Sequence, residues 1–239
     1  MSALGHYLEE EGIATVAISL IRPQTENTKP PRALWVPFEL GRPFGPPSDP
    51  AFQKRVILAA LLLIERASGP LIIEDFAEDD PRAHPDPGWQ PPRVPGPAAN
   101  GSAEVLAARL ESEIPLLQGA HDRWLARHGR TTIGLSALSM THCGHYVADW
   151  VRGKAPPSPR DGFSPPLILR FAVDDVKAYY LEAGAGSEKP SSRQLGDWFW
   201  NETAAGAALH VLRTACLASD DERLRLIAGN FMVPASRVR

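Results

Sequence analysis

The unbroken apolar run Val56–Ile64 is the feature of this sequence that most constrains its fold. Asp49 and Pro50 precede it at a spacing typical of a helix start, because Asp caps the first turn and Pro needs no amide partner there. The pattern predicts a helix over Ala51–Arg66 that is apolar on nearly all sides and therefore deeply buried. A fold that contains this helix must cover it with other apolar elements.

Three apolar stretches around this helix have the length and composition of buried strands: Ile13–Leu20, Ala33–Phe38 and Leu71–Phe76. Strands that alternate with buried helices are typical of a parallel, doubly wound sheet, so we expect an α/β fold over residues 1–78. A short helix over residues 2–11 leads into the first strand. Because such a helix normally follows an earlier strand of the same sheet, we expect the sheet to be partial, with its first strand absent.

A mainly helical region is expected after the α/β segment. Residues 79–102 are dense in Pro, Gly and Asp, which predicts an irregular linker or surface loop. Residues 103–239 then show apolar periodicity that predicts helices over 102–128, 142–152, 166–182, 193–217 and 221–228, with one further strand over 131–138. The expected fold class is therefore α/β, a partial doubly wound parallel sheet followed by a mainly helical region.

Composition excludes several classes of function. The formal charge of −3 gives no general attraction to nucleic acid. The longest apolar run is far shorter than the ~20 residues of a membrane-spanning helix, so no membrane partner is expected. Two cysteines are too few for a disulfide framework, which favours a cytoplasmic protein. No Gly-rich phosphate loop lies between a predicted strand and helix, so we expect no nucleotide cofactor.

The segment "THCGHY" places two imidazoles and a thiol close together, on His142, Cys143 and His145. Zn²⁺ accepts these ligand types, and His121 and His128 supply further imidazoles on one predicted helical face. Ser139, however, is typical of a helix N-cap, and neighbouring side chains in a helix point about 100° apart. We therefore favour a packed helix start over a metal site.

Cys143 is also a candidate nucleophile, because a helix N-terminus and flanking imidazoles lower the pKa of a thiol. The competing interpretation is a small core residue, which is the usual role of an unpaired cysteine, and we favour it. Cys216 lies in the apolar segment "LRTACLAS" and is expected in the core.

Glu74 and Asp75 lie at the end of the third predicted strand, within an acidic stretch that extends to Asp80. In doubly wound sheets, ligands bind beyond the carboxyl ends of the strands, which is where these carboxylates are expected. Paired carboxylates serve as acid and base or hold a hard cation. Acidic turns after strands are more commonly solvated caps, and this interpretation carries more weight.

Two segments of the first third, "GHYLEEEGIATVAISLIRP" and "PPRALWVPFELGRPFGPPSDPAFQKRVILAAL", combine a helix, a strand, a loop, a second strand and the element Pro37–Pro43 in that order. In this order and spacing, residues 2–78 resemble the selenoprotein B family. Its members are the substrate-activating subunits of glycine, sarcosine, betaine and D-proline reductases. Residues 100–239 match nothing that we can place in these reductases.

The resemblance implies chemistry in which a selenolate or thiolate attacks a substrate carbon that bears an amine, and thiols resolve the adduct. In that family the redox residues lie in a turn just before the helix that corresponds to residues 2–11. This chain has no cysteine in its first third, so the redox residue maps to no position here. We expect it before Met1, upstream of a start misread at a selenocysteine codon. The competing expectation is a whole chain that acts as a binding or assembly module.

From this resemblance we expect a component of a thiol- or selenol-dependent reductase that acts on a small amino-acid-like substrate. Arg22 and Arg42, just beyond predicted strands, would hold the substrate carboxylate, with solvent exposure as the competing interpretation for each. The alternative function is a non-catalytic module that binds a small molecule, a protein partner or a second copy of the chain, with the Trp-rich segment 198–200 in the contact. A third is a hydrolase with Cys143 as its nucleophile.

Overall fold

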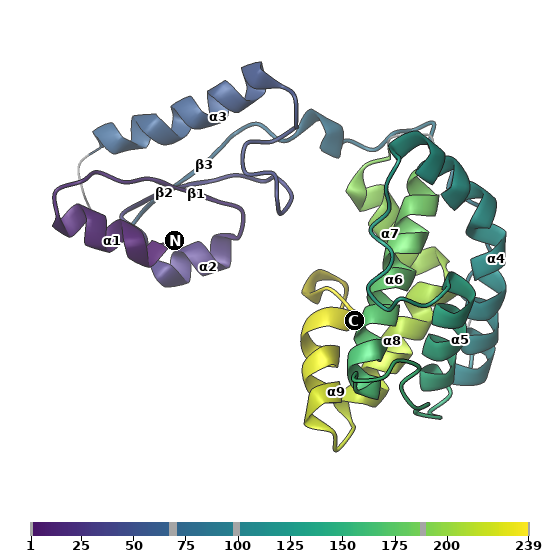
Figure 1. Ribbon diagram of the computed structural model, residues 1–239. Helices are drawn as coiled ribbons and strands as arrows, with labels where there is room; N and C mark the ends of the chain where they lie inside the picture. Colours follow the sequence, from purple (N-terminus) through teal and green to yellow (C-terminus); the bar gives the residue numbers. More distant parts are fainter. Residues whose placement is uncertain (1, 67–70, 98–100, 187–189, 239) are drawn as a thin grey trace. The chain divides into compact units, whose positions relative to one another are not determined.

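A computed structural model describes residues 2–66, 71–97, 101–186 and 190–238. The chain divides into two compact units, Met1–His84 and Pro85–Arg239, which we call the α/β unit and the helical unit (Figure 1). The expectation of an α/β fold with a mainly helical region is confirmed. The boundary falls inside the predicted linker, after a short 3₁₀ turn at Pro81–Ala83.

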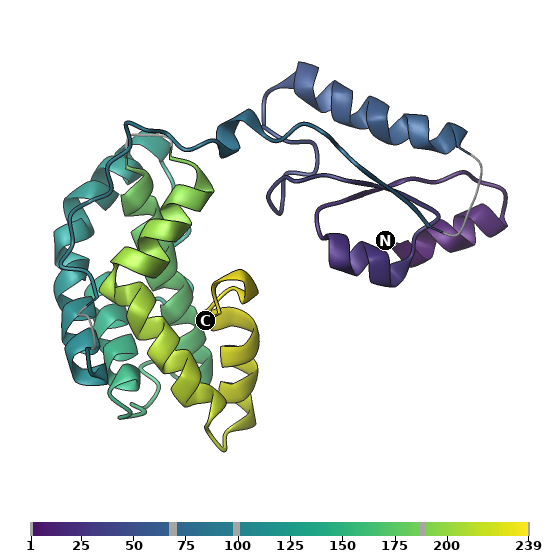
Figure 2. The same ribbon diagram turned by 180° about the vertical axis from the view of Figure 1, so that it is seen from behind.

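The described residues of the α/β unit form a parallel sheet with strand order β1-β2-β3. Its strands are β1 (Ala17–Ser19), β2 (Arg32–Trp35) and β3 (Ile72–Asp75). Its helices are α1 (Ser2–Glu10), α2 (Arg22–Thr28) and α3 (Pro50–Leu62), which the 3₁₀ turn Leu63–Glu65 extends. The helix α3 lies on one side of the sheet, and α1 and α2 lie on the other (Figures 1 and 2). The sheet is therefore covered on both faces, as parallel sheets generally are.

An ion pair attaches the residues around α1 to the sheet. Arg32 of β2 is only 5 % exposed, and its guanidinium contacts the Glu9 carboxylate of α1. The same carboxylate accepts a hydrogen bond of 2.7 Å from the Thr15 amide, which lowers the pKa of Glu9 most, and Arg32 lowers it further. This contact fixes the turn between α1 and β1.

The core of the α/β unit lies between α3 and the sheet. Phe38, Phe52 and Phe76 meet edge-to-face there, with ring centroids 5.5 to 6.0 Å apart. Asp49 caps α3 as predicted, since its Oδ1 accepts from the Phe52 amide at 3.0 Å. The prediction that α3 is buried on all sides is wrong. One side packs on the sheet, and the other, which includes Leu58, is exposed.

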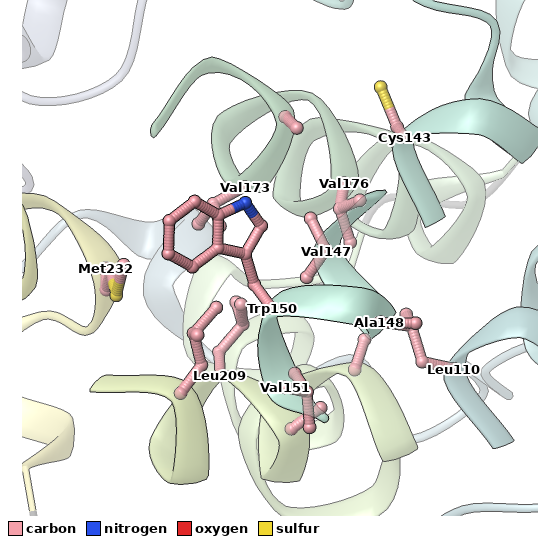
Figure 3. Close-up of a cluster of buried hydrophobic side chains, with 14 of the residues drawn as sticks. Leu110, Cys143, Val147, Ala148, Trp150, Val151, Val173, Val176, Leu209 and Met232 are labelled. Carbon is pink, nitrogen blue, oxygen red and sulfur yellow. The ribbon is translucent and has the colours of Figure 1, made fainter. Parts of the chain in front are cut away.

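The helical unit contains α4 (Ala103–His128), α5 (Met140–Val151), α6 (Pro165–Ala185), α7 (Ser192–Glu202), α8 (Ala204–Leu217) and α9 (Glu222–Ile227). A π turn, Ala228–Met232, and a 3₁₀ turn, Ala235–Arg237, follow α9. The long helix α4 continues through Pro115 and packs against α5, α6 and α8. Trp150 of α5 lies within the core that these helices enclose (Figure 3).

The predicted single helix over 193–217 is wrong, because α7 and α8 are separate helices that meet at Thr203. The Thr203 backbone is extended, and its hydroxyl caps α8 by accepting from the Gly206 amide at 3.0 Å. The buried Glu113 carboxylate of α4 accepts from the Ala204 amide at 2.9 Å and from the Tyr180 hydroxyl at 3.0 Å. This carboxylate satisfies amides that a helix start leaves without partners, so the break depends on a residue from another helix.

The predicted strand over 131–138 is also wrong, since this segment is a loop that is hydrogen-bonded to α6. The Asp175 carboxylate accepts from the Gly134, Leu135 and Ser136 amides at 2.8 to 3.0 Å. Glu182, two turns further along α6, accepts from the Thr132 amide at 2.8 Å. The backbone amides of this segment therefore donate to side chains of α6, whereas a strand would have needed a neighbouring strand as its partner.

The segment after the unit boundary belongs to the helical unit. The Asp86 amide donates to Gln194 at 2.8 Å, and the Trp89 indole donates to the Gly184 carbonyl at 3.1 Å. Of the predicted linker 79–102, residues 79–84 therefore belong to the α/β unit, and residues 85–97 belong to the helical unit. Residues 98–100, in the rest of that predicted linker, lie outside the described residues.

Candidate functional site

The carboxyl ends of the three strands bring their last residues together. Ser19 of β1 lies beside Trp35 of β2, and Trp35 lies beside Asp75 of β3. Residues in register on neighbouring strands point to the same face of the sheet, so these three side chains share one face. Open α/β sheets bind their ligands at this edge, which makes it the candidate site.

Arg22, at the start of α2, supplies a positive charge at this edge. Its guanidinium forms ion pairs with Asp75 and, at 2.9 Å, with Glu26, and its central carbon lies 5.6 Å from the centre of the Trp35 ring. The hydrogen bonds that Arg22 donates to the Asp75 and Glu26 carboxylates raise the pKa of Arg22, which stays charged. The side chains of Arg22 and Asp75 are 38 % and 55 % exposed. A cation, an anion and an aromatic ring are thus accessible to solvent at one place.

The chemistry of this set suits a small zwitterion. A planar guanidinium binds a carboxylate through two parallel hydrogen bonds. A carboxylate such as that of Asp75 accepts hydrogen bonds from an ammonium group, and an indole ring attracts a methylated ammonium. Sequence reasoning missed Trp35, because the strand was predicted to run to Phe38, whereas β2 ends at Trp35.

The other two predicted substrate-binding residues make their ion pairs elsewhere. Glu74 directly precedes Asp75, so its side chain points to the opposite face of the sheet, and it pairs with Arg66 at 2.8 Å. Arg42 lies in the loop before α3, with its Nη1 4.0 Å from the Asp80 carboxylate. Of the four predicted residues, the structure brings Arg22 and Asp75 into contact with each other.

The predicted metal ligands do not converge. His142 is exposed, and His145 is exposed with its Nδ1 3.0 Å from the Glu111 carboxylate. His121 is buried against Glu182 at 2.9 Å, and His128 contacts the Trp124 carbonyl at 2.8 Å. Within the described ranges, no group of three His, Cys, Asp or Glu side chains is arranged to hold a metal ion.

Cys143 lies in the core of the helical unit, as the favoured interpretation expected. Its side chain is fully buried, and its Sγ is 3.1 Å from the Ser136 hydroxyl. Burial raises the pKa of the Cys143 thiol to about 11, and burial raises that of Cys216 to about 11 as well. A nucleophile needs both a thiolate and access to substrate, and this position provides neither.

The helical unit has a cavity of about 320 Å³ between the start of α6 and the end of α9. Its lining is mainly apolar and includes two arginines: Ser164, Pro166, Leu167, Arg170, Arg223, Leu226, Ile227 and Phe231. The Nε of Arg170 is buried without a hydrogen-bond partner among the described residues, and the Asp174 carboxylate lies 3.8 Å from it. An apolar wall with a guanidinium at its side suits a small apolar carboxylate.

Comparison of the chain with protein-family models, with curated proteins and with solved structures gives no match. In the described part of the chain, no helix is both long and apolar enough to cross a bilayer.

Proposed function

We propose that the α/β unit binds a small amino-acid-like zwitterion at the carboxyl edge of its sheet. In this proposal it is the substrate-binding component of a thiol- or selenol-dependent reductase of the glycine, sarcosine, betaine and D-proline reductase type. The observation that carries the proposal is the Arg22–Asp75 ion pair beside Trp35. The resemblance of residues 2–78 to the selenoprotein B family supports the reductase part of it.

In the proposed complex the ligand separates the two members of the ion pair. Arg22 binds the ligand carboxylate with two hydrogen bonds, and Trp35 covers the methyl or methylene groups. Asp75 attracts the ammonium by its charge and accepts a hydrogen bond where the ligand nitrogen carries a proton. Exposed ion pairs contribute little to stability, so their exchange for ligand contacts has a small cost. The same side chains then hold both ends of the ligand and leave its central carbon accessible.

In the reductase chemistry proposed here, a selenolate or thiolate attacks the carbon that bears the amine, a new bond to selenium or sulfur forms, and the amine leaves. Both cysteines of the chain are buried in the helical unit, so neither is suited to this attack. The attacking group would therefore be supplied from outside these residues. The contribution of this chain is to bind and orient the substrate.

The binding part is tested by calorimetric titration of the full chain with glycine, sarcosine, betaine and D-proline. We expect at least one of them to bind, and Arg22→Met to weaken that binding by about tenfold or more. Arg66→Met is the matched control, because Arg66 pairs with Glu74 on the opposite face of the sheet and should leave binding unchanged. Absence of binding by all four compounds would contradict the proposal.

The reductase part is tested separately, by assaying amine release from the bound compound in the presence of a dithiol and a selenol. Release that depends on the chain supports a reductase component. Binding without release supports the alternative, a non-catalytic module that binds a small molecule.

A second candidate function is favoured by the cavity in the helical unit. There the helical unit would bind a small apolar carboxylate, with Arg170 and Arg223 at the charged end. Titration with octanoate tests this, and Arg170→Met should weaken binding by about tenfold. Arg225→Met is the control, because Arg225 lies on α9 outside the cavity lining and donates to the Ser219 carbonyl. Equal weakening by both variants, or no binding, would exclude the cavity as the site.

A further inference from the structure

The side of α3 that faces away from the sheet is apolar and exposed. Its large side chains, which we call the α3 outer face, are 41 to 54 % exposed: Ile57, Leu58, Leu61 and Leu62. The inner side of the same helix packs into the core through Phe52, Val56 and Ala60. Large apolar side chains grouped in this way usually mark an interaction surface.

Charged residues of opposite sign border the α3 outer face at its two ends. Lys54 lies one turn before Leu58, and Glu65, in the turn that extends α3, lies one turn after Leu61. The spacing from Lys54 through Leu58 and Leu61 to Glu65 is four, three and four residues, which keeps them on one side of the helix. Lys54 and Glu65 are both exposed, and neither makes an ion pair with another described residue.

This arrangement is symmetric about the midpoint of the face, between Ala59 and Ala60. Three pairs of residues lie at equal distances from that midpoint: Ile57 and Leu62, Leu58 and Leu61, and Lys54 and Glu65. Two copies of the helix packed antiparallel about this point therefore place each residue of a pair opposite its counterpart. Leucine meets leucine, and lysine meets glutamate at both ends. A surface that is complementary to itself is what a two-fold symmetric interface requires.

We propose that the α3 outer face binds the same face of a second copy of this chain in an antiparallel, two-fold symmetric dimer. In this dimer Leu58 packs against Leu61 of the partner subunit, and Lys54 forms an ion pair with Glu65 of the partner subunit. The symmetric charges favour a second copy over an unrelated partner. Arg55, also on α3, is already held by Glu78 at 2.7 and 2.9 Å and is not needed in the contact.

The apolar part of the contact is tested by sedimentation velocity of the full chain over about a hundredfold range of concentration. We expect a concentration-dependent dimer, and Leu58→Glu should shift it to monomer by burying a charge at the centre of the interface. Leu40→Glu is the control, because Leu40 is an exposed apolar residue in a loop of the same unit. Because both leucines are exposed, neither substitution should affect folding, which circular dichroism checks.

Charge reversal at Lys54 and Glu65 tests whether the two copies of α3 pair in the antiparallel direction. Lys54→Glu places glutamate opposite Glu65 of the partner subunit, and Glu65→Lys places lysine opposite Lys54 of the partner subunit. Each reversal acts at both ends of the interface and should weaken the dimer by about tenfold at low salt. The double reversal restores opposite charges and should recover the original dimer constant.

Three results would overturn the proposal. One is a monomer at every concentration, which would mean that the α3 outer face does not bind a second copy. The second is a dimer that Leu58→Glu leaves intact, which would place the interface elsewhere. The third is a double variant, Lys54→Glu with Glu65→Lys, whose dimer is as weak as the dimers of the two single variants. This result would exclude the antiparallel register.

Discussion

In the helical unit, Asp175 is fully buried and accepts hydrogen bonds from three backbone amides, whereas in the α/β unit Asp75 is 55 % exposed and pairs with the side chain of Arg22. Glu113 follows the first pattern, with partners from the backbone of Gly96 and Ala204. The buried carboxylates of Asp175 and Glu113 therefore have backbone amides as partners, whereas the exposed carboxylate of Asp75 has an arginine side chain.

This difference in partners determines where a ligand can bind without unfolding the chain. A buried carboxylate whose oxygens are occupied by fixed amides cannot change partners unless a loop or helix end moves, because an unpaired buried amide is costly. An exposed carboxylate paired with a flexible arginine can exchange that partner for a ligand at little cost. The buried carboxylates of Asp175 and Glu113 are therefore structural, and the sheet edge of the α/β unit is the better candidate for binding.

The largest effect is expected at Glu113, which holds the start of α8. Glu113→Ala leaves the Ala204 amide, the Gly96 amide and the Tyr180 hydroxyl buried without their acceptor. We expect the free energy of unfolding of the helical unit to fall by about 4 kcal/mol. Urea titration followed by tryptophan fluorescence measures this change, because five of the six tryptophans, all except Trp35, lie in this unit.

Glu104→Ala is the matched control for this change, since Glu104 is on the same helix and its side chain is 70 % exposed. We expect it to change the unfolding free energy by less than about 1 kcal/mol. Burial raises the pKa of Glu113, and the amides of Ala204 and the other donors offset part of that rise. An equal loss of unfolding free energy in Glu113→Ala and Glu104→Ala would contradict the expected difference between a buried and an exposed carboxylate.

A smaller effect is expected for Asp175→Asn, which keeps the size of the side chain but turns one acceptor into a donor. That donor faces amides of residues 134–136, so we expect a loss of about 2 kcal/mol. Cys143 should also become easier to alkylate. Its neighbour Ser136 donates a hydrogen bond of 2.5 Å from its hydroxyl to Asp175, and the substitution weakens this contact. Mass spectrometry of timed alkylation measures this rate.

Cys216 is the internal control for the alkylation, because it is buried and has the same raised pKa but lies on α8, outside the loop. In the wild-type chain both thiols should react only on unfolding, since a pKa of about 11 leaves about one thiolate in a thousand at pH 8. Equal acceleration of both cysteines would indicate global destabilisation and not release of the loop.

A third effect is expected at Glu111, which is intermediate between the two patterns. Arg152 binds both of its carboxylate oxygens at 2.8 Å, and hydrogen bonds from Arg152 and then His145 lower the pKa of Glu111 to about 2. A carboxyl whose pKa is lower in the folded state contributes stability above its unfolded value of 4.5, and loses it as pH falls towards 2. We expect Glu111→Gln to cost about 1 kcal/mol at neutral pH and nothing near pH 2, because the partly exposed pair is screened by solvent. Unfolding at a series of pH values measures this, and an equal cost at both extremes would exclude the ion pair as its source.

Local signals in the sequence predicted the parts of the fold that depend on neighbouring residues. The caps at Asp49 and Ser139 and the alternation of strands and helices were all found in this way. The break at Thr203 was not, because it depends on Glu113, ninety residues earlier in the chain. The exposed side of α3 was not predicted either, since an apolar helix pattern does not say which faces have partners.

Part of the candidate site could be predicted, because the carboxyl ends of parallel strands lie at one edge of the sheet. This rule placed Asp75 at the edge, and Arg22, in the loop after the first strand, at the same edge. The rule could not separate Glu74 from Asp75, because adjacent strand residues point to opposite faces and the register was unknown. It also could not exclude Arg42, whose position depends on how the loop before α3 folds.

The smallest effect on stability is expected for Asp75→Asn, and this variant is the direct counterpart of Asp175→Asn. Both substitutions replace one carboxylate oxygen with an amide nitrogen, but Asp75 is exposed and its main partner, Arg22, keeps Glu26 at 2.9 Å. We therefore expect no measurable change in the free energy of unfolding. Binding of the zwitterion should nevertheless weaken, because the neutral amide no longer attracts the ligand ammonium. Calorimetry and urea unfolding on the same sample measure both quantities. A loss of stability as large as that of Asp175→Asn would show that Asp75 is structural. That result would contradict the proposal that the sheet edge is the binding site.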